Sequence, residues 1–226
     1  MNWFRTKQRG NEPPWPENRH RLFACAPLVE VGGAIPDDPD TPQSRFHAAL
    51  AHLQVGDSEH AIAQIQEILR MDEANSLLSL QAWSCLRELG REPVPPEAGV
   101  LRGVVVDLGR QGSVETAAAY EDGSAEVLHP GGCGSTPGHR DASVDKCVEA
   151  LLAAASEVQG EMADGMAAVT PTDGRARISF LTFAGIRALD GEEAALRRDP
   201  GPRAVLELAE RLCSMLAGRD SPAHTA

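Results

Sequence analysis

The apolar positions of this chain follow two periods, a helical one before residue 91 and an alternating one after residue 100. Between residues 41 and 90, three runs place apolar side chains at helical spacing, and polar breaks at 56–57 and 72–75 separate them. The first run begins at Thr41-Pro42, where threonine can cap the free amides of a helix and proline suits its first turn. The pattern therefore predicts three helices within residues 41–90.

Residues 100–218 combine strand-like alternation with two helical stripes. Asp122-Gly123 separates two alternating runs and is typical of a type I′ hairpin turn, which needs positive φ at both central positions. The predicted strands are 101–108, 114–121, 125–129, 177–183 and 186–189, the predicted helices are 144–158 and 202–216, and a loop is expected at 129–140. The order βββαββα predicts an α+β fold, with one antiparallel sheet of about five strands and two packed helices.

Prolines and glycines divide the chain into five parts. We expect a mostly irregular, proline-rich basic arm and linker at 1–40, the helical unit at 41–90, a proline-rich linker at 91–99, the α+β domain at 100–218 and a tail at 219–226. Within the first part, the run 28–31 favours one short strand at the edge of a sheet. The pattern leaves open whether the helical unit packs on the α+β domain.

The segment 56–75 resembles the second half of a tetratricopeptide repeat. Gly56 permits a tight turn between helices, Ala61 permits close helix contact, and a closing Asp-x-x-Asn makes the next turn. The sequence departs from the family at Glu73, where a proline is usual, and it keeps only Phe46 of the large aromatic residues in the first helix. Since stable arrays need about three repeats, this unit should pack against something else. The resemblance implies a tetratricopeptide-like helical hairpin plus one further helix, with a surface that holds peptides or partners.

Four segments of the chain also resemble a group of uncharacterised bacterial proteins, which implies no activity. They are Leu86–Gly90, Gly103–Asp107, Ala119–Ala125 and Ile178–Thr182. The order of elements is similar to that of roadblock, longin and profilin-like sheets, which often serve as dimeric adaptors. A self-associating regulatory module, and with it a homodimer, is therefore one alternative, although it rests on fold analogy alone.

Composition narrows the classes of partner. Acidic residues outnumber basic ones by 33 to 21, the net charge is −12, and aromatic residues make up 4% of the chain. An acidic chain with few aromatic residues does not suit a phosphate backbone or stacked bases, so we expect no nucleic-acid partner. No apolar run approaches about 18 residues, which predicts no membrane span. Five cysteines without a CxxC favour reduced thiols, so we expect a cytoplasmic protein.

The polar run from His129 to Asp141 is the strongest candidate for chemistry. His129, Cys133 and His139 carry side chains that bind zinc, although the spacing His-x3-Cys-x5-His matches no standard zinc knuckle. Cys133 and His139 would form a nucleophilic pair only with an orienting group; Asp141 suits that role but is also a candidate helix cap. An enzyme or metal-binding protein that uses this loop is the second alternative. We assign no catalytic residue and expect no cofactor.

The features together favour a non-enzymatic protein–protein interaction or adaptor module. Residues 1–21 hold five basic and two acidic side chains, a net charge of +3 on an otherwise acidic body. We expect two partner-binding surfaces: this arm, around Trp3, Phe4 and Trp15, and the groove beside the helices at 41–90. The identity of the partner protein does not follow from these patterns.

Overall fold

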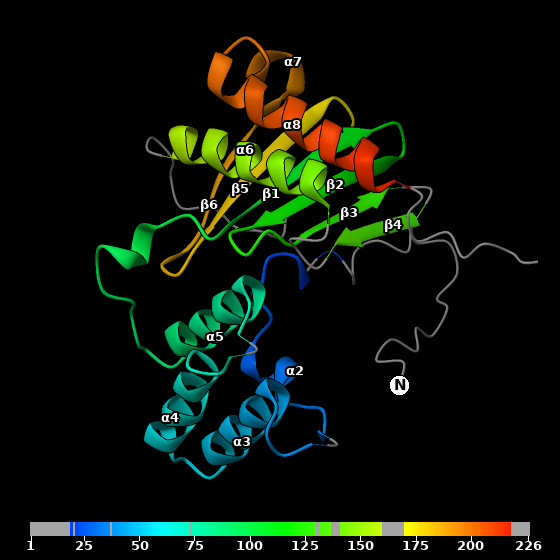
Figure 1. The fold of residues 1–226 in the computed structure, drawn as a ribbon. Coiled ribbons are helices and arrows are strands. Elements are labelled where there is room, and N and C mark those ends of the chain that lie inside the picture. Colours follow the sequence, from blue (N-terminus) through cyan, green and yellow to red (C-terminus); the bar gives the residue numbers. More distant parts are fainter. Residues whose placement is uncertain are drawn as a thin grey trace, which may run out of the picture.

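The computed structural model describes residues 19, 21–36, 38–72, 74–129, 132–136, 141–159 and 170–217, with only the backbone at 132–135. The chain is α+β, as the pattern predicts: a helical unit lies below an antiparallel sheet, and two long helices lie above it (Figure 1). In the described residues the first elements are α2 (Leu28–Val31), α3 (Pro42–Gln54), α4 (Ser58–Ile68), α5 (Ser76–Glu88) and the 3-10 turn Glu97–Gly99.

The three predicted helices at 41–90 are confirmed, and a capping side chain marks the start of each. The Thr41 hydroxyl accepts a hydrogen bond from the Ser44 amide, and the Ser44 hydroxyl accepts one from the Thr41 amide, which makes a capping box. Asp57 and Asn75 cap α4 and α5 by a single bond each, which their side chains accept from the His60 and Leu78 amides. An apolar stripe of α4, which includes the fully buried Ile65, then packs against α3 and α5.

The sheet has the strand order β4-β3-β2-β1-β5-β6, and every neighbouring pair is antiparallel. Its strands are β1 (Gly103–Arg110), β2 (Ser113–Tyr120), β3 (Ala125–His129), β4 (Gly132–Thr136), β5 (Arg175–Thr182) and β6 (Gly185–Glu192). The helices of this part are α6 (Ala142–Val158), α7 (Glu193–Leu196) and α8 (Pro200–Leu216). Because β1 lies in the middle of the sheet, its side chains are buried on both faces.

Two local predictions are wrong. The run 28–31 forms the helical turn α2 rather than an edge strand, because four apolar-rich residues after a proline carry no decisive period. Residues 132–136 form β4, within the range where a loop was expected, and this strand adds to the five predicted ones in the described sheet. The sequence Gly-Cys-Gly-Ser-Thr has no alternation of apolar and polar residues that would predict a strand. It forms a strand because its backbone pairs with β3.

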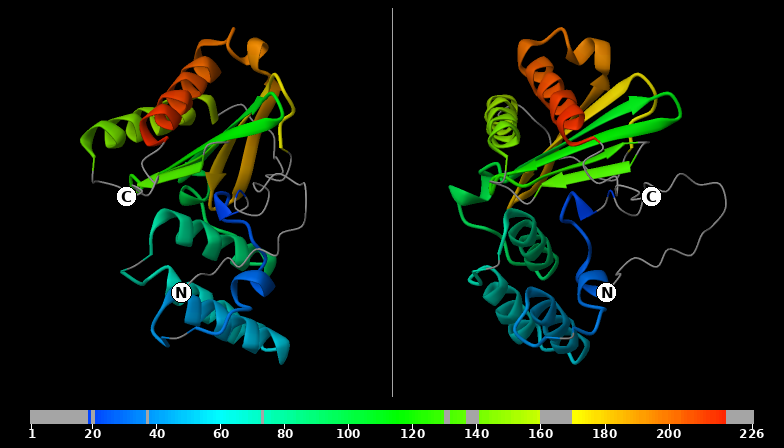
Figure 2. Two further views of the ribbon diagram at one scale, coloured as in Figure 1. Left: turned by 90° about the vertical axis from the view of Figure 1, so that its right-hand side faces the viewer. Right: turned by 45° about the vertical axis from the view of Figure 1, so that its right-hand side comes forward.

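The two faces of the sheet are covered by different parts of the chain. The helices α6 and α8 pack side by side on one face, against a core that includes Val104, Val106 and Ile178 (Figures 1 and 2). On the opposite face, Leu22 and Phe23 join α5 residues in a second core with sheet residues such as Tyr120. The Tyr120 hydroxyl donates a hydrogen bond of 2.7 Å to the Leu22 carbonyl. The helical unit therefore packs on the sheet, which the sequence pattern left open.

Candidate functional site

Residues 26–33, which we call the inner segment, lie between α3 and α5. On the α5 side, Gln81 makes a paired contact with one residue: its amide nitrogen donates to the Ala26 carbonyl at 2.6 Å, and its amide oxygen accepts from the Ala26 N–H at 3.2 Å. Two helical turns further, Glu88 accepts from the Leu28 N–H at 3.0 Å. Gln81 and Glu88 share one face of α5, so the side chains of this face form hydrogen bonds with the backbone of the inner segment.

The α3 side holds the other end of the inner segment. Gln43 donates from its side-chain amide to the Val31 carbonyl. His47 lies on the same helix face, and its Nδ1 is 2.9 Å from the Gly32 carbonyl; since a carbonyl only accepts, Nδ1 carries the proton. The inner segment is thereby held at both ends by side chains of α3 and α5.

Side-chain selection at the inner segment depends on two positions. Leu28 is fully buried in the core of the helical unit, which contributes about 1.5–3 kcal/mol. At Gly32, an added Cβ would lie 2.6 Å from the Phe46 carbonyl oxygen and 2.9 Å from the Leu50 Cβ, so no side chain fits there. By contrast, Val29 is 64% exposed. The contacts therefore hold the backbone of the inner segment, and its best-defined side-chain positions are a leucine and, four residues later, a glycine.

A buried ion pair of Arg19 holds the chain just before the inner segment. Arg19 donates from Nε and Nη2 to the two carboxylate oxygens of Asp107, at 2.9 and 2.6 Å, and both residues are buried. Thr116, the cross-strand neighbour of Asp107 on β2, donates a third hydrogen bond of 2.7 Å. Arg177 faces Asp107 from β5, and burial lowers the pKa of Arg177. This polar centre anchors the start of the described N-terminal residues to the middle of the sheet.

The prediction that the arm at 1–21 binds a partner stays a prediction, but two of its basic residues contact the chain itself. Arg19 and Arg21, at the end of the arm, bind Asp107 and Glu126 of the same chain. Trp3, Phe4 and Trp15 lie outside the described residues, so their role stays a prediction. The arm therefore divides at Arg19 into two parts: residues 1–18, which lie outside the described residues, and Arg19 and Arg21, which belong to the fold.

A cavity of about 330 Å3 lies beside the polar centre, near the turn between β1 and β2. Arg19 and Arg110 line it, but both are already paired: Arg19 with Asp107, and Arg110 with Glu115 and two other glutamates. Apart from the carboxylate of Asp173, its remaining lining is apolar or carries hydroxyl groups, such as Val114 and Thr170. The cavity therefore offers an apolar and hydroxyl surface rather than a cation for an anionic ligand.

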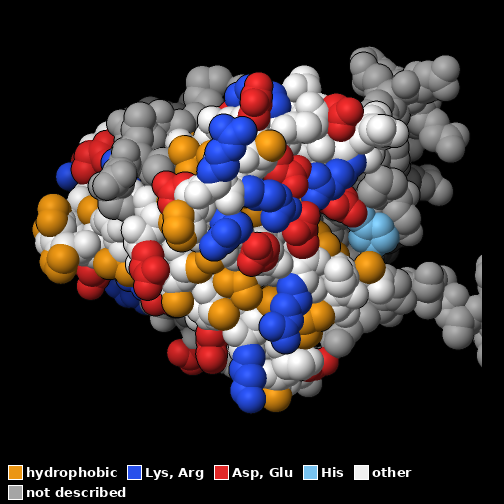
Figure 3. Space-filling model, turned by 90° about the horizontal axis from the view of Figure 1, so that it is seen from above, with side chains coloured by type: hydrophobic (Ala, Val, Ile, Leu, Met, Phe, Trp, Pro, Cys, Tyr) orange, Lys and Arg blue, Asp and Glu red, His pale blue; other side chains and the backbone are white. Residues whose placement is uncertain are grey.

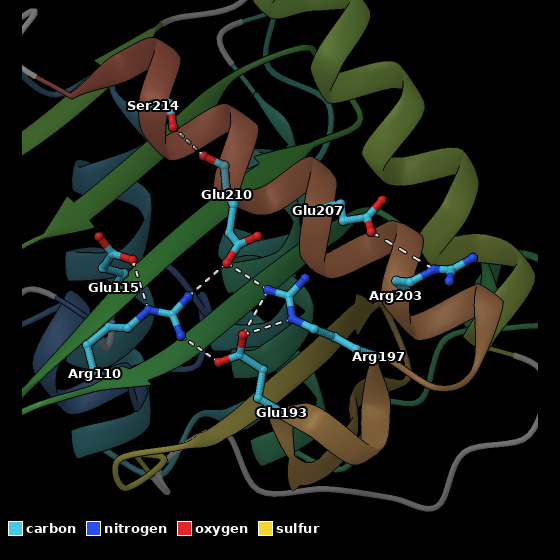
Figure 4. Close-up of polar contacts among 8 residues, drawn as sticks. All are labelled: Arg110, Glu115, Glu193, Arg197, Arg203, Glu207, Glu210 and Ser214. Carbon is cyan, nitrogen blue, oxygen red and sulfur yellow. Dashed lines mark hydrogen bonds and ion pairs between the residues drawn. The ribbon is translucent and has the colours of Figure 1, made fainter.

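The glutamates that hold Arg110 belong to a network that ties the sheet to its helices (Figure 4). Arg110, at the end of β1, contacts Glu193 of α7 and Glu210 of α8, and Arg197 bridges the same two carboxylates. Burial alone would raise the pKa of Glu193, but hydrogen bonds from Arg197 and Arg110 outweigh it and lower the pKa. On the outer face of these helices, basic and acidic side chains lie next to one another (Figure 3), which does not suit a phosphate backbone.

The structure places only one of the predicted metal ligands in full. His129 ends β3 and lines a second cavity of about 270 Å3 together with Glu210 and Cys213. Burial, followed by Glu115 and Glu210, raises the pKa of Cys213 to about 12, so this thiol is a poor nucleophile at neutral pH. Cys133 is placed by its backbone alone, opposite Leu128.

The remaining residues of the predicted loop site divide in two. His139 lies outside the described residues, and with it the predicted pair with Cys133. Asp141 caps α6, because its Oδ1 accepts from the Ser143 and Val144 amides at 2.9 and 3.3 Å. Of the two roles that the sequence allowed for Asp141, the structure confirms the helix cap.

The inner segment was missed by the analysis of the sequence. Gln43, His47, Gln81 and Glu88 are polar residues on helices, and such residues ordinarily face solvent. Their i, i+4 and i, i+7 spacings put each pair on one face, but nothing in the spacing indicates what that face contacts. Gly32 was the one residue whose type could have indicated this contact, since a glycine after an apolar run can mark a close approach of two backbones.

In the part of the chain that the structure describes, no helix is long and apolar enough to cross a membrane. No protein-family model matches the chain, and neither a curated protein nor a solved structure matches it. Function must therefore be argued from the contacts themselves.

Proposed function

We propose that this chain is a non-enzymatic protein-interaction module that binds a short segment of a partner protein on the surface between α3 and α5, in the place of the inner segment. One observation carries the proposal: five hydrogen bonds from α3 and α5 side chains end on main-chain atoms of residues 26–32. Contacts to the main chain do not depend on the identity of the bound residues, so they suit any segment of the right shape.

The partner segment has a defined chemistry. It carries a leucine at the position of Leu28 and a glycine at the position of Gly32, a pattern Leu-x-x-x-Gly. Between them, Val29 and Glu30 face solvent and are free to vary, whereas Val31 is half-buried against the core of the helical unit and favours an apolar residue. Each main-chain hydrogen bond contributes about 0.5–1.5 kcal/mol and the leucine about 1.5–3 kcal/mol, which together support a weak to moderate affinity after the cost of ordering.

The inner segment competes with any partner, because it is covalently attached and so has a high effective concentration. A partner segment therefore binds well only when the inner segment is weakened or released. This predicts that a change that expels the inner segment exposes the binding surface, whereas the same change in an added peptide abolishes binding of that peptide.

The test is a fluorescence-anisotropy titration with a labelled peptide of residues 26–35. Three titrations are compared: the unaltered chain with the unaltered peptide, a Gly32→Val chain with the unaltered peptide, and the Gly32→Val chain with a Gly32→Val peptide. We expect at least about tenfold tighter binding in the second titration than in the first, and none in the third. Circular dichroism verifies that the altered chain is folded.

A second version needs no substitution in the inner segment. A protease site placed at 38–40 is cut after folding, which makes the inner segment part of a separate fragment. An exchange of this fragment with the labelled peptide supports the proposal. A folded Gly32→Val chain that binds no peptide, together with a cut chain that does not exchange, means that the inner segment is only part of the core and overturns the proposal.

A further inference from the structure

The turn between α3 and α4 brings together two histidines and an aspartate. His52 lies in the last turn of α3, Asp57 is the N-cap of α4, and His60 lies in its first turn. The two imidazole rings are stacked, with centroids 5.3 Å apart and an angle of 20° between their planes. These residues are separate from those that hold the inner segment, and the sequence analysis did not single them out.

The ligand atoms of the three side chains converge. The Asp57 Oδ2 is 2.7 Å from the Nδ1 of His60 and 3.7 Å from the Nδ1 of His52, and one ligand atom from each residue lies within 4.8 Å of the others. Bonds of about 2.0–2.2 Å to a tetrahedral zinc ion place its ligand atoms about 3.3 Å apart. The side chains are 36%, 38% and 70% exposed for His52, Asp57 and His60, so small rotations reach this spacing without disturbing the core.

The backbone of the turn holds the aspartate in place. Asp57 Oδ1 accepts from the His60 amide at 3.3 Å, which caps α4 and leaves Oδ2 directed at the two rings. The Asp57 amide donates to the His52 carbonyl at 2.9 Å, which ties the end of α3 to the start of α4. Gly56, at a φ of +81°, makes the turn that allows this contact. Groups that are already oriented lose less conformational freedom when they bind an ion.

We propose that His52, Asp57 and His60 bind one divalent transition-metal ion, and that this ion is zinc or a chemically similar metal. Two imidazole nitrogens and one carboxylate oxygen suit zinc and its neighbours, whereas calcium and magnesium take oxygen ligands. Three protein ligands leave the fourth position of a tetrahedral ion open to water or to a group from another molecule. The ion would clip the α3–α4 hairpin at its turn.

The test is isothermal titration calorimetry of the full chain with zinc chloride alone, after treatment with a chelator. We expect one zinc ion per chain, and an affinity that falls at least about tenfold in His52→Ala and in His60→Ala. Asp57→Asn is the third variant, because asparagine still caps α4 but supplies no charged ligand. His129→Ala is the matched control: it removes one imidazole from the rival site predicted at 129–139, and its affinity should equal that of the unaltered chain.

Nuclear magnetic resonance of the histidine side chains locates the ion independently. Addition of zinc should shift or broaden the ring signals of His52 and His60 and leave those of His129 unchanged. Two outcomes overturn the proposal: no binding of zinc by the folded chain, or binding that survives in His52→Ala and His60→Ala. Loss of zinc in His129→Ala would assign the ion to the loop at 129–139 instead.

Discussion

Arg19 and Asp107, 88 residues apart in the chain, form a two-pronged ion pair at the centre of the sheet, on the face opposite α6 and α8. Asp107 is fully buried, and Arg19 and the Thr116 hydroxyl hold its carboxylate while Arg177 faces it from β5. An uncompensated buried charge costs far more than an intact pair contributes. Through this contact, the end of the N-terminal arm contributes to the stability of the fold.

We predict that Arg19→Met lowers the free energy of unfolding by about 3–5 kcal/mol, because it leaves Asp107 buried without the guanidinium that binds both of its oxygens. The matched control is Arg21→Met, whose ion pair with Glu126 is more exposed, and it should lower this free energy by less than about 1 kcal/mol. Adding Asp107→Asn to Arg19→Met removes the orphaned charge and should restore part of the loss. Equilibrium urea unfolding measures all three, and equal effects of the two arginine variants would contradict the prediction.

Truncation separates the two parts of the arm. Deletion of residues 1–18 keeps Arg19, whereas deletion of residues 1–21 removes it together with Arg21. We predict that the longer deletion unfolds at a lower urea concentration than the shorter one, by a difference comparable to that of Arg19→Met. Partner binding that is lost in the shorter deletion, with stability preserved, would assign binding to the part that holds Trp3, Phe4 and Trp15.

The Arg110 network should stabilise the chain modestly and in a pH-dependent way. Arg110→Met removes three ion pairs, and at about 0.2–1 kcal/mol each for partly exposed pairs we expect a loss of about 1–2 kcal/mol. Arg203→Met is the control, since its contact with Glu207 is 4.0 Å long and exposed.

The pKa of Glu193 is lowered from its ordinary 4.5, so the contribution of the network is present above about pH 4.5 and is lost as the pH falls through the lowered pKa. The difference in unfolding free energy between the unaltered chain and Arg110→Met should therefore shrink in acid. A difference that grows as the pH falls from 6 to 3 would count against this account.

Gly109 permits a close approach of two backbones. An added Cβ would lie 1.9 Å from the Thr172 carbonyl oxygen, and backbone cannot move aside as a flexible side chain does. We predict that Gly109→Ala lowers the unfolding free energy by about 3 kcal/mol, at the upper end of overpacking effects. Gly99→Ala is the matched control, because its Cβ would meet nothing within 4 Å. Thermal melts followed by circular dichroism compare the two, and similar melting temperatures would refute the prediction.

Two buried thiols should make the chain sensitive to alkali. Burial, above all, raises the pKa of Cys85 to about 11 and that of Cys213 to about 12, from an ordinary value of 9.0. Above pH 9 the unfolded chain loses these protons while the folded chain keeps them, so stability falls as the pH rises from about 9 towards 11 and 12. Each thiol contributes up to about 1.4 kcal/mol per pH unit in that window. Urea unfolding at pH 8 and pH 10 should show a smaller loss for Cys213→Ala than for the unaltered chain.

Residues that are close in the chain account for most of what could be predicted. Thr41 and Asp141 cap helices because a cap involves only neighbours within three residues. Asp122-Gly123 lies in the turn between β2 and β3 for the same reason, but the predicted type I′ geometry is wrong, because Gly123 has a φ of +79° and Asp122 has no positive φ. The α+β class, the three helices of the helical unit and the helix pair α6 and α8 all follow from such local periods. The interaction function, the cytoplasmic location, and the absence of nucleic-acid partners and cofactors stay predictions, since nothing in the described structure tests them.

By itself, the sequence determined where helices and most strands form, because hydrophobic period, caps and turn residues act over a few positions. Only the tertiary structure decided that β4 joins the sheet, that 28–31 forms a helical turn, that Arg19 pairs with Asp107 and that Gln81 holds Ala26. It likewise decided that His52, Asp57 and His60 meet, since a turn must close before their ligand atoms converge. Such contacts join residues through space, and a polar side chain carries no local sign of whether it will face water or a distant part of its own chain.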